Sequence, residues 1–247
     1  MSLISFENVT KRFDGRPVLD GLSFTVEKGE ILCIVGPSGT GKSVTLKHLV
    51  RLLTPSSGRV VVDGIDIAKC PDAELEKLRG RIGYLFQSGA LLAWMTVAEN
   101  VALPLEECTS LSDEEISGRV AAALGAVELS DAAGKYPSEI SGGMQKRAGL
   151  ARAIVRDTDI VLYDEPTSGL DPVTAATIDR LVKKLNRELG ITSIVVTHDI
   201  VSALKIADRI LLIKRGKAVE CSAPAQFAKS ANPEVREFLE AAKGEAI

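Results

Sequence analysis

The chain has 247 residues, of which 45% are apolar and 26% charged, a balance typical of a globular protein with a buried core. Thirty Lys and Arg residues against 33 Asp and Glu residues give a net charge of −3. This balance lacks the basic excess that nucleic-acid-binding proteins show. The longest apolar run, with glycine counted, is Val120–Val127. It is far shorter than the roughly 20 residues of a membrane-spanning helix, so we expect no such span.

Residues 1–10 carry Glu7 and other polar side chains where a secretory signal peptide would have an apolar stretch. The cysteines are far apart in the chain, without a Cys-x-x-Cys pair or a neighbouring histidine, and they are Cys33, Cys70, Cys108 and Cys221. This spacing supports neither a disulfide framework nor a zinc site. Both observations predict a protein that stays in the cytosol.

Three short apolar segments are rich in β-branched residues and do not alternate with polar ones: Ile31–Val35, Ile160–Tyr163 and Ile194–Val196. Strands that are buried on both faces have this pattern. Helical stretches lie between them, and one begins at Asp171 and Pro172, an N-cap followed by a residue suited to the first turn. Alternation of buried strands and helices predicts a three-layer α/β fold with a mostly parallel sheet.

Two other regions have different patterns. The first 30 residues and Arg59–Ile67 show period-two patches and turn glycines, which predict an antiparallel edge sheet. Between Ser88 and Arg156 we find no strand pattern, whereas Ser112 and Glu115 form a capping box before a helical repeat. The middle of the chain is therefore predicted to be a helical insertion in the α/β core.

Residues 36–43 match the complete phosphate-loop pattern G-x-x-x-x-G-K-[ST], and they read Gly36, Pro37, Ser38, Gly39, Thr40, Gly41, Lys42 and Ser43. A buried strand precedes the motif, and a helix predicted from about Ser43 to Leu52 follows it, as the chemistry requires. The glycines let backbone N–H groups converge on phosphate oxygens at a helix N-terminus. Lys42 can reach the β- and γ-phosphates, and the Ser43 hydroxyl can be a ligand of Mg²⁺.

Acidic residues and a histidine follow the other two buried strands. Asp164 and Glu165 come at the end of the strand at 160–163, and His198 comes just after Ile194–Val196. Because the carboxyl ends of parallel strands face the ligand crevice, Asp164 is predicted to hold Mg²⁺ and Glu165 to polarise the attacking water. His198 is predicted to hydrogen-bond the γ-phosphate or the water. Lys42, Glu165 and His198 are thus the predicted catalytic residues.

A second anion-binding arrangement, Ser141-Gly142-Gly143, opens a helix inside the helical insertion. One nucleotide rarely needs two such sites from one subunit. We therefore expect a second copy of the chain to supply it, so that ATP is enclosed between two chains.

With these motifs in order, the sequence resembles the ATPase subunits of ABC transporters along nearly its whole length. The resemblance implies a P-loop (RecA-like) core at 1–87 and 157–220, a helical subdomain at 88–156 and a helical tail at 221–247, all in one domain over 1–247. It implies ATP and Mg²⁺ as cofactors. The further roles that it implies are adenine stacking by Phe13, Mg²⁺ and partner sensing by Gln87, γ-phosphate contact in trans by Ser141, Gly142 and Gly143, and a dimer-seam loop that ends at Asp171.

The strings at 85–92, 99–105 and 137–144 are similar to those of the Mla-type phospholipid transporter ATPases. Met144 stands where the wider family has Gln, which also points to a subfamily. This resemblance implies transport of phospholipid between the membranes of a bacterial envelope. It implies a membrane permease that docks near Gln87–Val101, MCE-domain and STAS-domain partners, and a peripheral place at the cytoplasmic face of the inner membrane.

Other functions stay open at this level. The leading alternative is an importer ATPase for amino acids or metal ions, because cargo does not touch this subunit. A soluble ABC ATPase of DNA repair or translation is disfavoured, since the chain lacks long inserts, a second ATPase unit and a basic surplus. A catalytically silent regulatory subunit is disfavoured by the presence of both Glu165 and His198.

Overall fold

The computed structural model describes residues 2–244. Met1 and residues 245–247, which fall within the predicted 1–247 domain and its tail, lie outside the described residues. The chain divides into two compact units, Met1–Leu75 with Thr192–Ile247 and Glu76–Ile191. The boundary falls within helix α2 (Asp72–Arg79). The predicted subdivision at 87, 156 and 220 stays a prediction.

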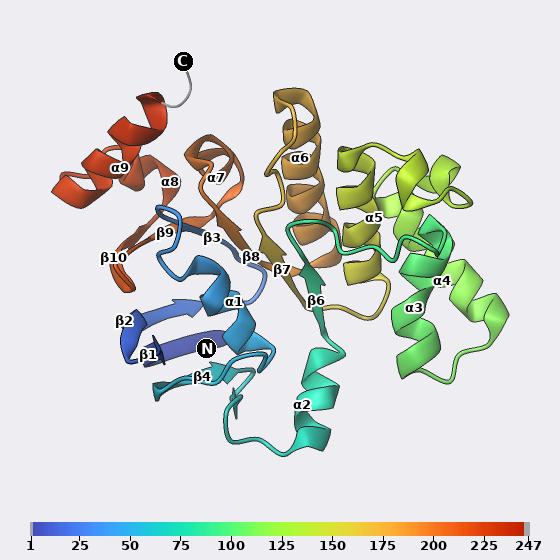
Figure 1. The fold of residues 1–247 in the computed structure, drawn as a ribbon, viewed down its shortest axis with the longest axis horizontal. Helices are drawn as coiled ribbons and strands as arrows, with labels where there is room; N and C mark the ends of the chain where they lie inside the picture. Colours follow the sequence, from blue (N-terminus) through green and yellow to red (C-terminus); the bar gives the residue numbers. More distant parts are fainter. Residues whose placement is uncertain (1, 245–247) are drawn as a thin grey trace. The chain divides into compact units, whose positions relative to one another are not determined.

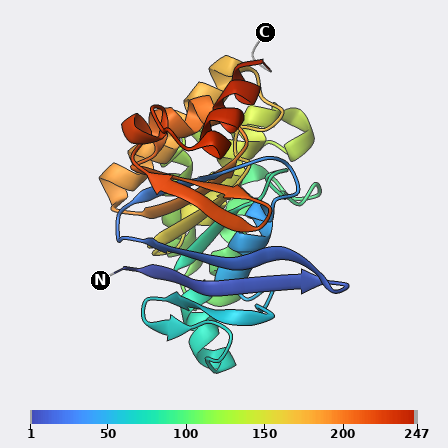
Figure 2. The same cartoon turned by 90° about the vertical axis from the view of Figure 1, so that its left-hand side faces the viewer.

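The first unit begins with an antiparallel sheet in which β1 lies between β2 and β4, and β5 pairs with β4. Figure 2 shows the two long N-terminal strands running side by side. The elements of this unit are β1 (Ile4–Phe13), β2 (Arg16–Val26), β3 (Ile31–Val35), α1 (Lys42–Leu49), β4 (Ser57–Val62), β5 (Ile65–Asp66), β8 (Thr192–Thr197), α7 (Ile200–Ile206), β9 (Arg209–Lys214), β10 (Lys217–Ser222), α8 (Pro224–Phe227) and α9 (Pro233–Gly244). The predicted antiparallel sheet is therefore confirmed, as a sheet of its own.

The core of this unit is built on β3, which pairs in parallel with both β8 and β9. Every residue of β3 and β8 is buried, which explains why their sequences are continuous apolar or small-residue runs. β10 returns antiparallel to β9 through Arg215 and Gly216, both with positive φ, as a tight hairpin requires. The sequence predicted β3 and β8 but no strand at the positions of the β9–β10 hairpin.

Helix α1 begins at Lys42, directly after Gly41, and ends at Leu49. The sequence predicted a longer helix, to about residue 52. Arg51 has a φ of 49°, a left-handed conformation that cannot continue a right-handed helix. At the other end of the chain, α9 is amphipathic as expected, with Val235 fully buried.

The second unit contains the parallel pair β6–β7 and most of the helices. Its elements after α2 are β6 (Ile82–Leu85), α3 (Val97–Cys108), α4 (Asp113–Ala126), the short 3-10 helices η1 (Ser130–Ala132) and η2 (Pro137–Glu139), α5 (Gly142–Ile154), β7 (Ile160–Asp164) and α6 (Pro172–Leu189). β7 is the strand expected at 160–163, and each of its residues is buried. β6 was not anticipated, because its short sequence, Ile-Gly-Tyr-Leu, carries little pattern.

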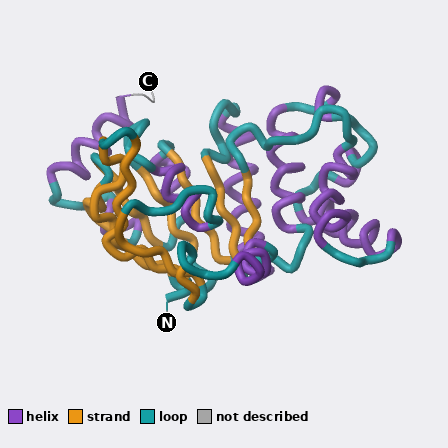
Figure 3. The backbone as a smooth tube through the Cα atoms, turned by 60° about the horizontal axis from the view of Figure 1, so that its bottom comes forward, coloured by secondary structure: helices purple, strands orange, loops and turns teal. Residues whose placement is uncertain are grey.

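Helices α3, α4 and α5 pack against one another (Figures 1 and 3). Residues 88–156 contain helices and no strand, as the sequence predicted. The predicted capping box of Ser112 and Glu115 starts α4, and Thr96 with Glu99 forms another at the start of α3. Asp171 caps α6 and Pro172 occupies its first turn, which confirms the start signal in the sequence.

Candidate functional site

The phosphate loop lies in the first unit, between the buried strand β3 and helix α1. The Lys42 ammonium folds back on the loop and donates to the carbonyl oxygens of Gly36, at 2.8 Å, and Pro37, at 3.1 Å. The N-cap of α1 is Gly41, which has no side chain to occupy the first N–H groups of the helix. These N–H groups and the buried cation together form a site suited to an anion.

Glycine is required at two points of this loop. A Cβ atom at Gly36 would lie 2.2 Å from the carbonyl oxygen of Ile213, and one at Gly41 would lie 2.6 Å from Leu19 Cδ2. Both residues also have a positive φ, of 152° and 95° respectively, which side chains disfavour. Glycine at positions 36 and 41 is thus explained by the packing of the loop against neighbouring strands of its own unit.

Two other predicted residues of the first unit are exposed to solvent. Phe13 ends β1 with 42% of its surface exposed, and Lys11 Nζ lies 5.2 Å from the centroid of its ring. An exposed ring with a cation over one face can stack on a planar base. His198 follows β8, and its side chain is exposed between Thr197 and the N-cap of α7, Asp199.

The carboxylates of the second unit sit at the end of β7. Asp164 is only 9% exposed, and Tyr84 of β6 donates its hydroxyl proton to Asp164 Oδ2 at 3.3 Å. Burial, together with the negative charge of Asp164, raises the pKa of Tyr84, so this hydroxyl stays protonated and remains a donor. Glu165 has a φ of 52°, a left-handed conformation that is uncommon outside glycine and often found at functional sites.

A buried lysine of α5 joins two of these segments. Lys146 is 6% exposed, and its ammonium donates to the backbone carbonyl oxygen of Gln87 and, at 3.2 Å, to that of Glu165. Burial lowers the pKa of Lys146, and the carboxylates of Glu165 and Asp164 oppose this shift. The Gln87 side chain, in turn, lies 3.4 Å from Ser168 Oγ.

The motif Ser141-Gly142-Gly143 opens α5, where Ser141 is the N-cap and accepts a hydrogen bond from Met144 N. Ser141 and Gly142 are exposed. A Cβ atom at Gly143 would lie 2.2 Å from Thr174 Cγ2, so only glycine fits at this point of contact between α5 and α6. Because Ser141 and Gly142 are exposed, the surface of this turn is open to a ligand or to another chain.

Asp171 caps α6 through hydrogen bonds from the backbone N–H groups of Val173 and Thr174. The Thr174 hydroxyl also donates to it, at 2.5 Å, and this bond is the main reason why the pKa of Asp171 lies below its ordinary value. The residue thus has a clear local role in addition to its predicted place at a dimer seam.

The structure brings Gln87, Asp164, Glu165 and the turn before Asp171 into one network of the second unit. Phe13, residues 36–43 and His198 belong to the first unit and are described there. Sequence reasoning missed Tyr84 and Lys146, which contact the predicted residues directly. In the sequence, Lys146 is only a lysine within a predicted helix. Its burial and its bonds to the distant residues Gln87 and Glu165 are visible only in the folded chain.

The predicted oxygen ligands of Mg²⁺ are the Ser43 hydroxyl, the Gln87 side-chain amide and the Asp164 carboxylate. Among residues 2–244, no group of three or more His, Cys, Asp or Glu side chains could hold a metal ion. Mg²⁺ prefers oxygen ligands and often keeps several of its water molecules. The Ser43 hydroxyl, in the first unit, and the oxygens of Gln87 and Asp164, in the second, are each donors of this type.

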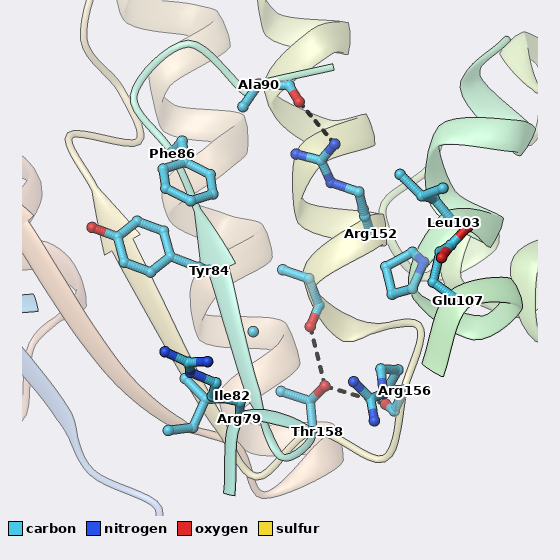
Figure 4. Close-up of a pocket in the computed structure, with 14 residues that line it drawn as sticks. Arg79, Ile82, Tyr84, Phe86, Ala90, Leu103, Glu107, Arg152, Arg156 and Thr158 are labelled. Atoms are coloured by element: carbon cyan, nitrogen blue, oxygen red, sulfur yellow. Dashed lines mark hydrogen bonds between the residues drawn. The ribbon is translucent and has the colours of Figure 1, made fainter. Parts of the chain in front are cut away.

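A groove of about 490 Å³ lies in the second unit between β6, α3 and α5 (Figure 4). The rings of Tyr84 and Phe86 are stacked with centroids 4.2 Å apart, and 38% of the surface of Phe86 is exposed. Arg152 spans the groove wall and donates to the carbonyl oxygens of Gly89 and Ala90, each at 2.8 Å. Nearby along the chain, Trp94 is 75% exposed. Such a concentration of exposed aromatic surface is typical of an interaction site.

No helix among the described residues is both long and apolar enough to span a membrane.

The family model of ABC transporters matches residues 19–168. The chain belongs to the ABC transporter family. It is an ATPase subunit of that family, as its motifs predicted. The match covers the phosphate loop, Gln87, the Ser141 turn and the Asp164–Glu165 pair.

Several curated proteins are similar over most of the chain. The intermembrane phospholipid transport system ATP-binding protein MlaF of Haemophilus influenzae is 42% identical over 99% of this chain and 91% of its own length. The methionine import ATP-binding protein MetN of Caulobacter vibrioides is 40% identical over 98% of this chain and 74% of its own length. The probable ribonucleotide transport ATP-binding protein mkl of Mycobacterium bovis is 42% identical over 96% of this chain. The chain spans 66% of the length of that mycobacterial relative.

Solved structures agree with the predicted fold class. A dimeric ATP-binding cassette in a post-hydrolysis state, bound to ADP and Pi, superposes with a TM-score of 0.81 at 37% identity, over 90% of this chain and 98% of that one. The cbiO1 protein of Clostridium perfringens, part of an ABC transporter complex, gives a TM-score of 0.85 at 29% identity, over 96% of this chain and 94% of that one. The P-loop fold with an antiparallel sheet and a mixed parallel sheet is thus confirmed.

Proposed function

We propose that this ATPase subunit powers phospholipid transport between the membranes of a bacterial envelope, through a partner permease. The observation that carries the proposal is the similarity of the strings at 85–92, 99–105 and 137–144 to Mla-type ATPases, together with the relative MlaF. These strings include β6, the following loop, α3 and the start of α5. Two of the strings line the groove, through Phe86 and Ala90 and through Leu103 and Pro104. A permease is the partner that such a surface would have to distinguish.

The other cargoes are those in the names of the relatives, methionine and ribonucleotides. Co-purification from membranes tests among them, with the bound proteins identified by mass spectrometry. We expect a lipid permease and an MCE-domain protein, with a STAS-domain protein as a further component. Recovery of an amino-acid permease in their place would contradict the proposal. The double substitution Phe86→Ala with Trp94→Ala removes two exposed rings of the proposed docking region and should reduce recovery of the permease.

We infer that two copies of the chain bind two ATP molecules with Mg²⁺ at a shared seam. Each phosphate loop would face the Ser141-Gly142-Gly143 turn of the other copy. The exposure of Ser141 and Gly142 supports this arrangement, and so does the similarity to a cassette that is dimeric with ADP and Pi. ATP favours the closed pair because only that state offers contacts from both copies.

Within each site, we propose that Lys42 contacts the β- and γ-phosphates and that Phe13 stacks on adenine. Ser43, Gln87 and Asp164 would hold Mg²⁺, whose positive charge offsets the charge on the phosphates. Glu165 would accept a proton from the attacking water, and His198 would hydrogen-bond the γ-phosphate. The catalytic gain would come mainly from positioning and from stabilisation of charge on the transferred group.

We propose that the permease docks on the region Gln87–Val101 and the adjoining groove. The aromatic pair Tyr84–Phe86 links this surface to Asp164 through the Tyr84 hydroxyl. Docking of the permease would place the chain peripherally at the cytoplasmic face of the inner membrane.

The substitution Glu165→Gln tests the catalytic part. It should keep ATP binding, abolish hydrolysis and trap a dimer that is visible by size-exclusion chromatography in ATP. Glu188→Gln, at an exposed position of α6, is the control and should behave as wild type. Hydrolysis by the Glu165→Gln protein at the wild-type rate would remove Glu165 from the mechanism.

A further inference from the structure

Lys146 of α5 is a buried charged group whose contacts the proposed mechanism does not use. Its ammonium donates to the carbonyl oxygens of Gln87 and Glu165, two residues that flank different strands, β6 and β7. We propose that Lys146 is a positioning residue, which fixes the backbone at Gln87 and Glu165 and thereby couples the Ser141 helix to the water-activating carboxylate. This inference rests on the roles proposed above for Gln87 and Glu165.

The two acceptors of the Lys146 ammonium indicate what this residue holds in place. Both partners are main-chain oxygens, so the ammonium restrains the path of the backbone rather than the rotamer of one side chain. With only 6% of Lys146 exposed, water cannot replace these bonds, and hydrogen bonds from a charged donor are among the stronger ones. A buried cation that lost its partners would be costly, which favours one fixed arrangement of the three segments.

Glu165 is a residue that needs such support. Its φ of 52° places it in a sparsely populated region, and strained residues persist only when their surroundings hold them. Its carbonyl oxygen accepts from Ser168 N and from Lys146 Nζ, each at 3.2 Å. Because the Gln87 side chain reaches Ser168 Oγ, the contacts of Gln87, Ser168, Glu165 and Lys146 form a closed ring.

The helix supplies the coupling. Lys146 lies five residues after the N-cap Ser141, on the same continuous helix α5. A shift of the Ser141 turn therefore carries the ammonium with it, because a short α-helix moves as a rigid rod. Contact of the turn with a ligand would thus be transmitted to the backbone at Glu165.

Arg147, the next residue, provides a matched comparison. It donates to the carbonyl oxygens of Glu128, at 2.6 Å, and Val127, at 3.5 Å, and so ties the same helix to the end of α4. It is a cation on backbone carbonyls, like Lys146, but these carbonyls belong to none of the nucleotide motifs. Substitution of Lys146 and of Arg147, compared side by side, therefore distinguishes a positioning role of Lys146 from a general loss of helix packing.

The test measures steady-state ATP hydrolysis and thermal unfolding for the full chain in its co-purified membrane complex. Lys146→Met keeps the length of the side chain and removes its donors. We expect kcat to fall on the order of 10- to 100-fold, the effect of a slightly misplaced reacting group, while KM for ATP changes less than about threefold. Lys146→Arg should recover most of the rate, since it restores a cation with several donors. Arg147→Met should lower Tm and leave kcat within about twofold of wild type.

Three results would overturn the inference: a folded Lys146→Met protein with wild-type kcat, an Arg variant as slow as the Met variant, or an equal fall of kcat in Arg147→Met. Should Lys146→Met fail to fold, Lys146→Gln carries the same test and should be slower than Lys146→Arg. Glu165→Gln is assayed alongside. If it stays active, the proposed role of Glu165 fails; if it is inactive while Lys146→Met has wild-type kcat, only the role of Lys146 fails.

Discussion

The phosphate loop and the network around Glu165 contain the residues proposed to act on ATP, but they are built in different ways. The loop at 36–43 is one continuous segment, in which Lys42 donates to the carbonyl oxygens of Gly36 and Pro37. The Glu165 network draws on β6, α5 and β7, which are far apart in the sequence. A phosphate site can thus be encoded locally, whereas a carboxylate held in a strained conformation needs support from several segments.

The largest effect on ATP hydrolysis is expected from Lys42→Ala, in the phosphate loop at 36–43. Removal of the buried ammonium should abolish hydrolysis and weaken ATP binding on the order of tenfold or more, since a charge-assisted contact with phosphate is lost. Isothermal titration with ATP and phosphate release measure the two effects. Lys47→Ala, an exposed position on the same helix, is the control. Normal turnover in Lys42→Ala would contradict the assignment of the loop.

His198→Ala tests a residue that was predicted to be catalytic because it follows the strand β8. We expect turnover to fall on the order of 100-fold, the scale of a lost polar contact with the reacting groups, with little change in Tm because the side chain is exposed. Asp199→Ala should show the reverse pattern. It removes the cap that accepts from Val201 N and Ser202 N, so Tm should fall more than turnover. A fall of Tm in His198→Ala equal to that in Asp199→Ala would indicate a structural role for His198.

Tyr84→Phe is a milder change, in the network around Glu165. It removes the hydroxyl that donates to Asp164 and leaves the ring stacked on Phe86. We expect kcat to fall by roughly three- to tenfold, the scale of one hydrogen bond to a charged acceptor. Tyr136→Phe, at an exposed tyrosine, should leave kcat unchanged. An unchanged kcat in Tyr84→Phe would show that Asp164 needs no support from β6.

The smallest effect is expected from Asp171→Asn, measured as Tm against pH. Hydrogen bonds from Thr174 lower the pKa of Asp171 below its ordinary value of 3.8, so the folded state favours the ionised form. The stabilisation is complete above that ordinary pKa and is lost as the pH falls through the lowered value. The wild type should therefore exceed Asp171→Asn in Tm at neutral pH, and the difference should shrink below about pH 4. A difference that is constant with pH would show that the charge of Asp171 contributes nothing.

The same contrast between local and assembled regions explains which expectations the sequence supported. β3, β7 and β8 were recognisable because burial on both faces leaves a continuous run of apolar or small residues. The caps at Ser112 and Asp171 were recognisable because capping depends on residues within one turn. Strand β6 was missed because its four residues carry little pattern. The β9–β10 hairpin was missed although β9 contains a continuous buried apolar run, Ile210–Ile213.

The local chemistry of this protein can be found in short stretches of its sequence: a glycine-rich loop with its lysine, carboxylates after a buried strand, and a Ser-Gly-Gly helix start. Each of these depends on residues within a few positions of one another, where backbone geometry leaves few alternatives. The bond from Tyr84 to Asp164, and the bonds by which Lys146 joins Gln87 to Glu165, are visible only in the folded chain. These contacts bridge long stretches of chain, and their formation depends on the packing of β6, β7 and α5 rather than on any local pattern.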